Sequence, residues 1–102
     1  MHLVQILLPV RDNQGKSYDK SMFDDVRNDL ATHFGGVTAF SRAPASGLWE
    51  NDDGNLVHDD VLIFEVMVDR LEREFWRLYR LELQSTFGQE TIPMRAQRIE
   101  LL

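Results

Sequence analysis

The chain has 102 residues, 43% of them hydrophobic, and it contains no cysteine. This length suits one domain, residues 1–102, with a substantial core. The missing cysteines exclude disulfides, thiol catalysis and cysteine-based zinc sites. With 17 acidic and 11 basic residues the formal net charge is −6, and no run of Lys and Arg offers a footprint for phosphate backbones. We therefore expect no nucleic-acid partner.

The N-terminal segment, residues 1–8, is short and lacks the basic region of a signal peptide. No apolar run approaches the roughly 20 residues that a membrane-spanning helix needs. We expect a cytoplasmic protein with no membrane association.

The first predicted elements are a strand and a helix. The strand covers Leu3–Val10 and is apolar on both faces, which is typical of a central strand. After a polar loop, Ser21 and Asp24 resemble a capping box, and Ser17 offers an earlier helix start. Apolar residues continue at helical spacing to Phe34, where Gly35 and Gly36 end the helix.

A hairpin follows. Val37–Arg42 is rich in β-forming residues, residues 43–47 interrupt it, and Leu48–Glu50 resumes it toward Asp53 and Gly54. The Asp-Gly pair favours a two-residue turn, which would place Trp49 opposite His58.

The strongest strand covers Val57–Val68. Asp69 is predicted to cap a second helix, which ends at Gly88. Its apolar stripe consists of Leu71, Phe75, Leu78, Tyr79, Leu83 and Phe87. Thr91–Leu102 is the last strand, and Pro93 within it favours an edge position.

The order βαββαβ predicts an α+β fold, the ferredoxin-like sandwich. Its four-stranded antiparallel sheet has the strand order 4-1-3-2, with both helices on one face. The second face would be uncovered and largely apolar. It would carry Leu3, Gln5, Leu7, Val61, Ile63, Glu65, Met67, Arg95 and Gln97. Because monomers seldom expose large apolar patches, we expect a homodimer, packed sheet on sheet or through strand edges. Either packing could enclose a small cavity.

Glu65 is the most informative candidate on that face, since it lies between Ile63 and Met67. In a structural role it would form an ion pair with Arg95 or Arg42. In a functional role it would act as a general base or as an anchor for a ligand.

Trp49, His58 and Arg42 form a second group of candidates. Trp49 could form a pocket wall beside His58, and Arg42 could hold an anion through its planar guanidinium; alternatively, both serve packing and ion pairing. His58 and Asp60 supply too few ligands for a zinc site, so we expect no metal and no cofactor. The arginines of the second helix alternate with glutamates, which is typical of a solvated face with i,i+4 pairs.

Three segments carry a resemblance to a known group of proteins. They are residues 34–38 (Phe-Gly-Gly-Val-Thr), residues 42–49 (Arg-Ala-Pro-Ala-Ser-Gly-Leu-Trp) and residues 59–61 (Asp-Asp-Val). In their order along the chain they are similar to small stand-alone bacterial proteins with a ferredoxin-like or dimeric α+β-barrel fold. The resemblance implies this fold and dimerisation, and it transfers no catalytic residue.

Two functions follow as hypotheses. The first is a homodimeric module that binds a small organic ligand or a protein partner through the open sheet face, using Arg42, Trp49, His58, Glu65 and Arg95. The alternative is a cofactor-independent enzyme of the dimeric-barrel type with Glu65 or His58 as acid/base. A purely structural interaction protein, which would use the face as a contact, is a third reading.

Overall fold

The computed structural model describes residues 1–34, 39–41, 45–50 and 56–102, with side chains for 1–34 and 61–102. The elements are β1 (His2–Pro9), α1 (Lys20–Phe34), β2 (Ala39–Ser41), β3 (Ala45–Glu50), β4 (Leu56–Val68), α2 (Arg73–Thr86) and β5 (Met94–Arg98). Two helices and an antiparallel sheet confirm the α+β class.

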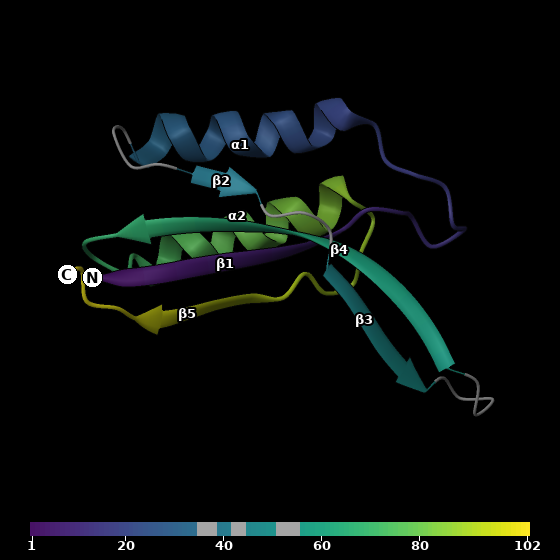
Figure 1. Cartoon of the computed structure of the whole chain (residues 1–102). Helices are drawn as coiled ribbons and strands as arrows, with labels where there is room; N and C mark the ends of the chain where they lie inside the picture. The colour runs from purple at the N-terminus through teal and green to yellow at the C-terminus, as the bar shows by residue number, and fades with distance from the viewer. Residues whose placement is uncertain (35–38, 42–44, 51–55) are drawn as a thin grey trace.

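The sheet is ordered β2-β4-β1-β5, and β3 pairs separately with the first half of the long strand β4. The expected four strands are therefore five, because the predicted second strand is divided into β2 and β3. Figure 1 shows β4 beside β3 in its first part and beside β2 near its end. As predicted, β1 lies between two neighbours and β5 is an edge strand.

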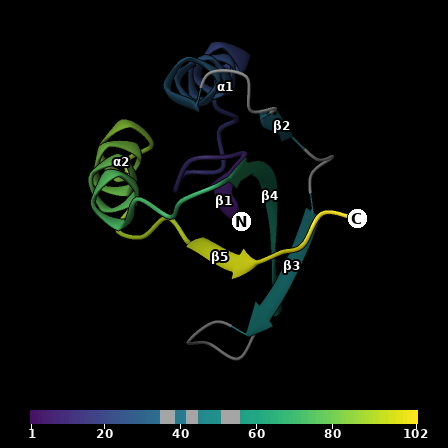
Figure 2. The ribbon, with the colours of Figure 1, turned by 90° about the vertical axis from the view of Figure 1, so that its left-hand side faces the viewer.

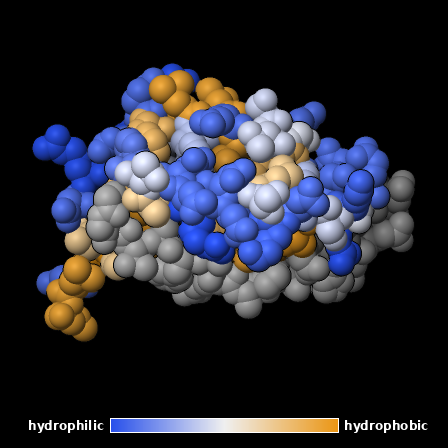
Figure 3. Space-filling model, turned by 90° about the horizontal axis from the view of Figure 1, so that it is seen from above, coloured by the Kyte–Doolittle hydropathy of each residue, from blue (hydrophilic) through white to orange (hydrophobic). Residues whose placement is uncertain are grey.

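Figure 2 shows both helices on the same side of the sheet, and the core lies between them and that face. On this face Val4 pairs with Val66 and Ile6 with Phe64, each at most 2% exposed. The helices contribute buried residues at helical spacing: Val26, Leu30, Trp76, Tyr79 and Leu83. Burial of this apolar surface is the main stabilising contribution to the fold. Figure 3 views the molecule from the α1 side, and the surface seen there, which faces away from the sheet, is mostly hydrophilic.

Both helix starts differ from the predictions. Helix α1 begins at Lys20, so Ser21 is not its cap, and Asp24 instead pairs with Lys20 at 3.0 Å and Arg27 at 2.9 Å. Helix α2 begins at Arg73 rather than after Asp69, with Glu72 at the N-cap position. Leu71 packs against the core, so the chain turns inward before the helix starts.

The apolar face of α2 is also rotated relative to the prediction. Leu78 is 53% exposed, whereas Trp76 is only 6% exposed. Trp76, Tyr79 and Leu83 follow the i, i+3, i+7 spacing of a single helix face, and Leu78 lies outside it.

The end of α2 is as predicted. Gly88 adopts φ +60°, Gln89 N donates to Gln84 O at 2.9 Å, and Gly88 N donates to Ser85 O at 3.3 Å. These two bonds form a Schellman motif, in which the left-handed position favours glycine.

Candidate functional site

A row of polar side chains crosses three strands on the sheet face opposite the helices. Gln5 of β1 is paired with Glu65 of β4 on one side and with Arg95 of β5 on the other. Gln5 Nε2 donates to Glu65 Oε1 at 2.8 Å, and Arg95 Nε donates to Gln5 Oε1 at 2.6 Å. The Gln5 amide thus bridges a cation and an anion, and the two bonds fix its orientation.

Exposure falls steadily along this Arg95–Gln5–Glu65 row. Arg95 is exposed, Gln5 is half-buried and Glu65 is 3% exposed. The expected link between Glu65 and Arg95 is therefore made through Gln5, which is the residue that the ion-pair hypothesis did not include. Arg42, the other expected partner, lies outside the described residues. The row therefore has a guanidinium at its exposed end and a hydrogen-bonded carboxylate at its buried end.

Strand periodicity explains why this row can form. Successive side chains point to opposite faces, so residues 4, 6 and 8 enter the core while residue 5 points away from it. The antiparallel registers of β1 with β4 and β5 then bring three distant residues into one line.

The sheet face around the row is less exposed than the sequence predicts. Ile63 is 8% exposed, and Leu3, Leu7 and Met67 are half-buried within a single chain. The exposed large apolar side chains among the described residues lie elsewhere: Met1, Leu78, Leu81, Leu101 and Leu102. The described apolar side chains of this face are thus partly or fully buried within one chain, and the homodimer stays a prediction.

Trp49 and His58 belong to another part of the sheet. Trp49 pairs with Val57, and His58 pairs with Leu48, so the predicted Trp49–His58 pairing is wrong by one residue. Glu50 pairs with Leu56, which leaves residues 51–55 between them, an odd number where a two-residue turn was expected. Along β4, His58 lies seven residues from Glu65, or about 23 Å at strand spacing. One small molecule does not span both positions within a chain.

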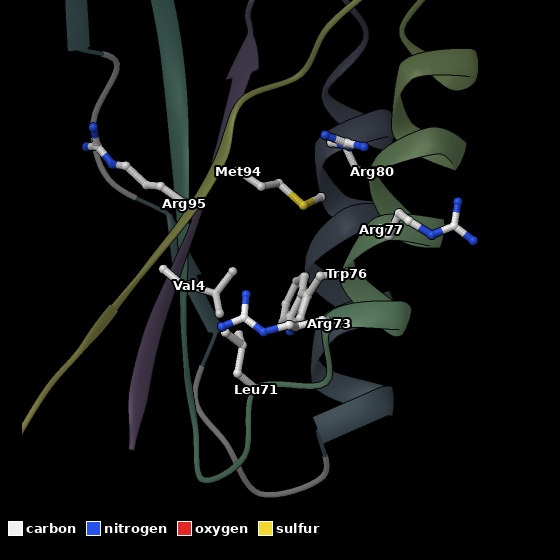
Figure 4. A pocket seen from close by; sticks show the side chains of 9 residues that line it. Val4, Leu71, Arg73, Trp76, Arg77, Arg80, Met94 and Arg95 are labelled. Atoms are coloured by element: carbon white, nitrogen blue, oxygen red, sulfur yellow. The ribbon is translucent and has the colours of Figure 1, made fainter.

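A groove between α2 and β5 was missed by the sequence analysis. Its volume is about 300 Å³, and we call it the arginine groove. It is lined by Val4, Leu71, Arg73, Trp76, Arg77, Arg80, Met94, Arg95 and Ala96, most of which Figure 4 labels. The sequence signal that could have indicated this groove is the i, i+4, i+7 spacing of Arg73, Arg77 and Arg80. This spacing places all three arginines on one side of the helix.

Within the part of the chain that has described side chains, α2 forms an arginine–glutamate pair between Glu74 and Arg77 at 2.6 Å. Its spacing is i,i+3 rather than the expected i,i+4. The hydrogen bond from Arg77 holds the pKa of Glu74 below its usual value.

Tyr79, which lies between the helices, has the pKa that is shifted furthest among the described residues. Burial raises its pKa, and the neighbouring Asp29 carboxylate, which accepts from the Tyr79 hydroxyl at 3.3 Å, raises it further. The hydroxyl therefore stays protonated at pH values well above the ordinary pKa of tyrosine. It serves as a hydrogen-bond donor between α2 and α1.

The described residues lack the features of a metal site and of a membrane-spanning helix. Across residues 1–34 and 61–102, no three His, Asp or Glu side chains gather around a point where an ion could bind. Neither α1 nor α2 has the length and apolarity needed to cross a bilayer.

No protein-family model and no curated protein sequence matches the chain. Two solved structures are similar to it, both of a phage SAM lyase. The structure in complex with S-methyl-5′-thioadenosine has 18% identity and a TM-score of 0.56, covering 95% of this chain and 80% of the other. The apo structure has 18% identity and a TM-score of 0.58, covering 94% and 78%. At this identity the likeness concerns the fold alone.

Proposed function

We propose that this chain binds S-adenosylmethionine (SAM) or its thioether product on the sheet face opposite the helices, and that it cleaves SAM as a lyase. The observation that carries the proposal is the Arg95–Gln5–Glu65 row, which holds a buried carboxylate at 3% exposure in a fold similar to a SAM lyase along 95% of the chain.

The charges of the row suit those of SAM. The substrate carries a carboxylate, an ammonium group and a sulfonium centre. Arg95, at the accessible end, would hold the carboxylate through its planar guanidinium. Glu65, at the inner end, would attract the cationic groups. Gln5 would act as a positioning residue, because its amide fixes both charged side chains.

The structures of SAM and S-methyl-5′-thioadenosine identify the bond that breaks. S-methyl-5′-thioadenosine retains the methyl and adenosyl groups of SAM, so its formation requires cleavage between sulfur and the γ-carbon of the amino-acid chain. The bonding electron pair stays on sulfur, which becomes a neutral thioether.

Two reaction routes account for all atoms and electrons in this cleavage. In elimination, Glu65 would accept a proton from the β-carbon, and the product is an unsaturated amino acid. In intramolecular displacement, the substrate carboxylate oxygen forms the new bond to the γ-carbon, and the product is a lactone. In that second route Glu65 contributes only charge.

The experiment is incubation of the purified chain with SAM, followed by mass spectrometry of both products. Wild type should release S-methyl-5′-thioadenosine, and the four-carbon product identifies the route. Glu65→Gln should lower kcat/KM by about a hundredfold if Glu65 is the base. Glu90→Gln, an exposed carboxylate in the loop after α2, is the matched control and should leave the rate unchanged.

Calorimetric titration with SAM and with S-methyl-5′-thioadenosine separates binding from turnover. Absence of turnover and of binding by either compound would overturn the proposal. Binding without product would instead identify a ligand-binding module, the second candidate function, which the half-buried face and its polar row also support.

The homodimer, the ferredoxin-like class and Arg42 remain parts of this proposal. If β2 and β3 are counted as one strand, the order of the sheet is that of a ferredoxin-like fold. Native mass spectrometry should report a dimer together with any co-purifying ligand. His58→Gln should spare turnover if Glu65, rather than His58, is the acid/base, and Arg42 would then contribute to binding.

A further inference from the structure

We propose that the arginine groove between α2 and β5 is a second ligand site, which binds the oxyanion of a small organic molecule with an apolar body. It lies on the helix side of the sheet, whereas the Arg95–Gln5–Glu65 row lies on the other side. The inference therefore goes beyond the proposed lyase activity and does not depend on it.

The composition of the groove is unusual for this chain. Four of its nine lining residues are arginines, and the lining contains no described Asp or Glu, in a chain whose formal net charge is −6. The remaining surface is apolar, from Val4, Leu71, Trp76, Met94 and Ala96. A volume of about 300 Å³ is at the small end of ligand sites.

Two residues that line the groove each carry a buried donor with no hydrogen-bond partner among the described residues. They are the indole Nε1 of Trp76, a side chain only 6% exposed, and the Nε of Arg80. Leaving a buried donor unpaired is costly, so such groups call for an explanation. Both nitrogens are shielded from solvent, so an oxyanion would accept from them after a side-chain shift on binding, and it would compensate the Arg80 charge in either case.

Not all four arginines are available for such a ligand. Arg77 is paired with Glu74, and Arg95 donates its Nε to Gln5. Figure 4 shows the guanidinium groups of Arg77 and Arg95 pointing away from the groove, while Arg73 reaches across it toward Val4. Arg73 and Arg80 are therefore the cations that the structure offers to the ligand.

These groups define the class of ligand. Guanidinium forks recognise phosphate and carboxylate oxygens with two parallel bonds. The apolar floor beside them favours an anion that carries an aromatic or aliphatic body over a bare inorganic ion. Phosphate monoesters and carboxylates share this chemistry, and the experiment distinguishes them.

The test is a titration of the full ¹⁵N-labelled chain with phenyl phosphate, followed through the indole N–H signals. The chain has two tryptophans, and Trp49→Phe assigns the remaining signal to Trp76. We expect the Trp76 signal to shift in a saturable way. Benzoate tests a carboxylate in place of the phosphate, inorganic phosphate tests the need for the apolar body, and benzyl alcohol tests the need for charge.

Arg80→Gln and Arg73→Gln should each weaken phenyl phosphate binding about tenfold, the loss expected for one charge-assisted hydrogen bond. Arg73 is exposed, so its variant should fold even if the Arg80 variant does not. Arg98→Gln removes the same charge from an exposed β5 position outside the groove, and it should bind like wild type. An unmoved Trp76 signal, equal binding of benzyl alcohol, or equal weakening by Arg98→Gln would overturn the proposal.

Discussion

The two faces of β1 and β4 are built from alternate residues of the same strands, yet they have different chemistry. On the helix side, Ile6 and Phe64 are paired and completely buried among apolar neighbours. On the other side, at the adjacent position of each strand, Gln5 and Glu65 are paired through a hydrogen bond. Burial alone does not distinguish the faces, since Glu65 is also only 3% exposed.

The difference lies in what each face gains from burial. The helix side gains the hydrophobic contribution, whose size follows the apolar area removed from water. The other side buries a polar group, which is tolerated because hydrogen bonds replace those to water. A polar row that runs from an exposed arginine to a buried carboxylate is therefore a candidate for function rather than for stability.

The largest effect should come from the apolar face. Phe64→Ala removes a ring that is completely buried, and we expect the free energy of unfolding to fall by about 3–5 kcal/mol. Leu7→Ala, on the half-buried opposite face, is the comparison and should cost clearly less. Urea denaturation followed by circular dichroism measures both. Equal losses would contradict the distinction between the faces.

An intermediate effect should come from the polar row. Gln5→Leu keeps a similar volume but removes a hydrogen-bond donor to the buried Glu65 carboxylate. We expect a loss of about 1–3 kcal/mol in the free energy of unfolding. Gln97→Leu, at an exposed position on β5, is the matched control and should change stability by less than about 0.5 kcal/mol. Indistinguishable variants would mean that the Gln5 bonds are not maintained in solution.

The smallest effect should be a change in the pH dependence contributed by Tyr79. Its folded pKa is raised above the ordinary value of 10.0, so as pH rises the unfolded chain loses this proton first. The contribution is therefore fully present below about pH 10 and is lost as the pH rises further. Urea midpoints measured from pH 8 to pH 11 should fall less steeply for Tyr79→Phe than for wild type. Parallel pH profiles would contradict the assignment.

Local sequence signals predicted the elements well where a single periodicity or turn was involved. Gly88 ends α2 because only its left-handed conformation completes the Schellman motif. Pro93, which cannot donate to a ladder, precedes a strand at the sheet edge. The prediction failed at the hairpin, where one residue in the connection shifts the pairing of Trp49 from His58 to Val57.

The sequence by itself determined which residues of β1 and β4 share a face, because side-chain alternation is a local property of the extended backbone. It thereby selected Glu65 and Arg95 as candidates. Only the tertiary structure decided that Gln5 joins them, because residues 5, 65 and 95 meet through the register of three strands. The arginine groove likewise depends on how α2 packs beside β5, a contact between distant segments that no local pattern records.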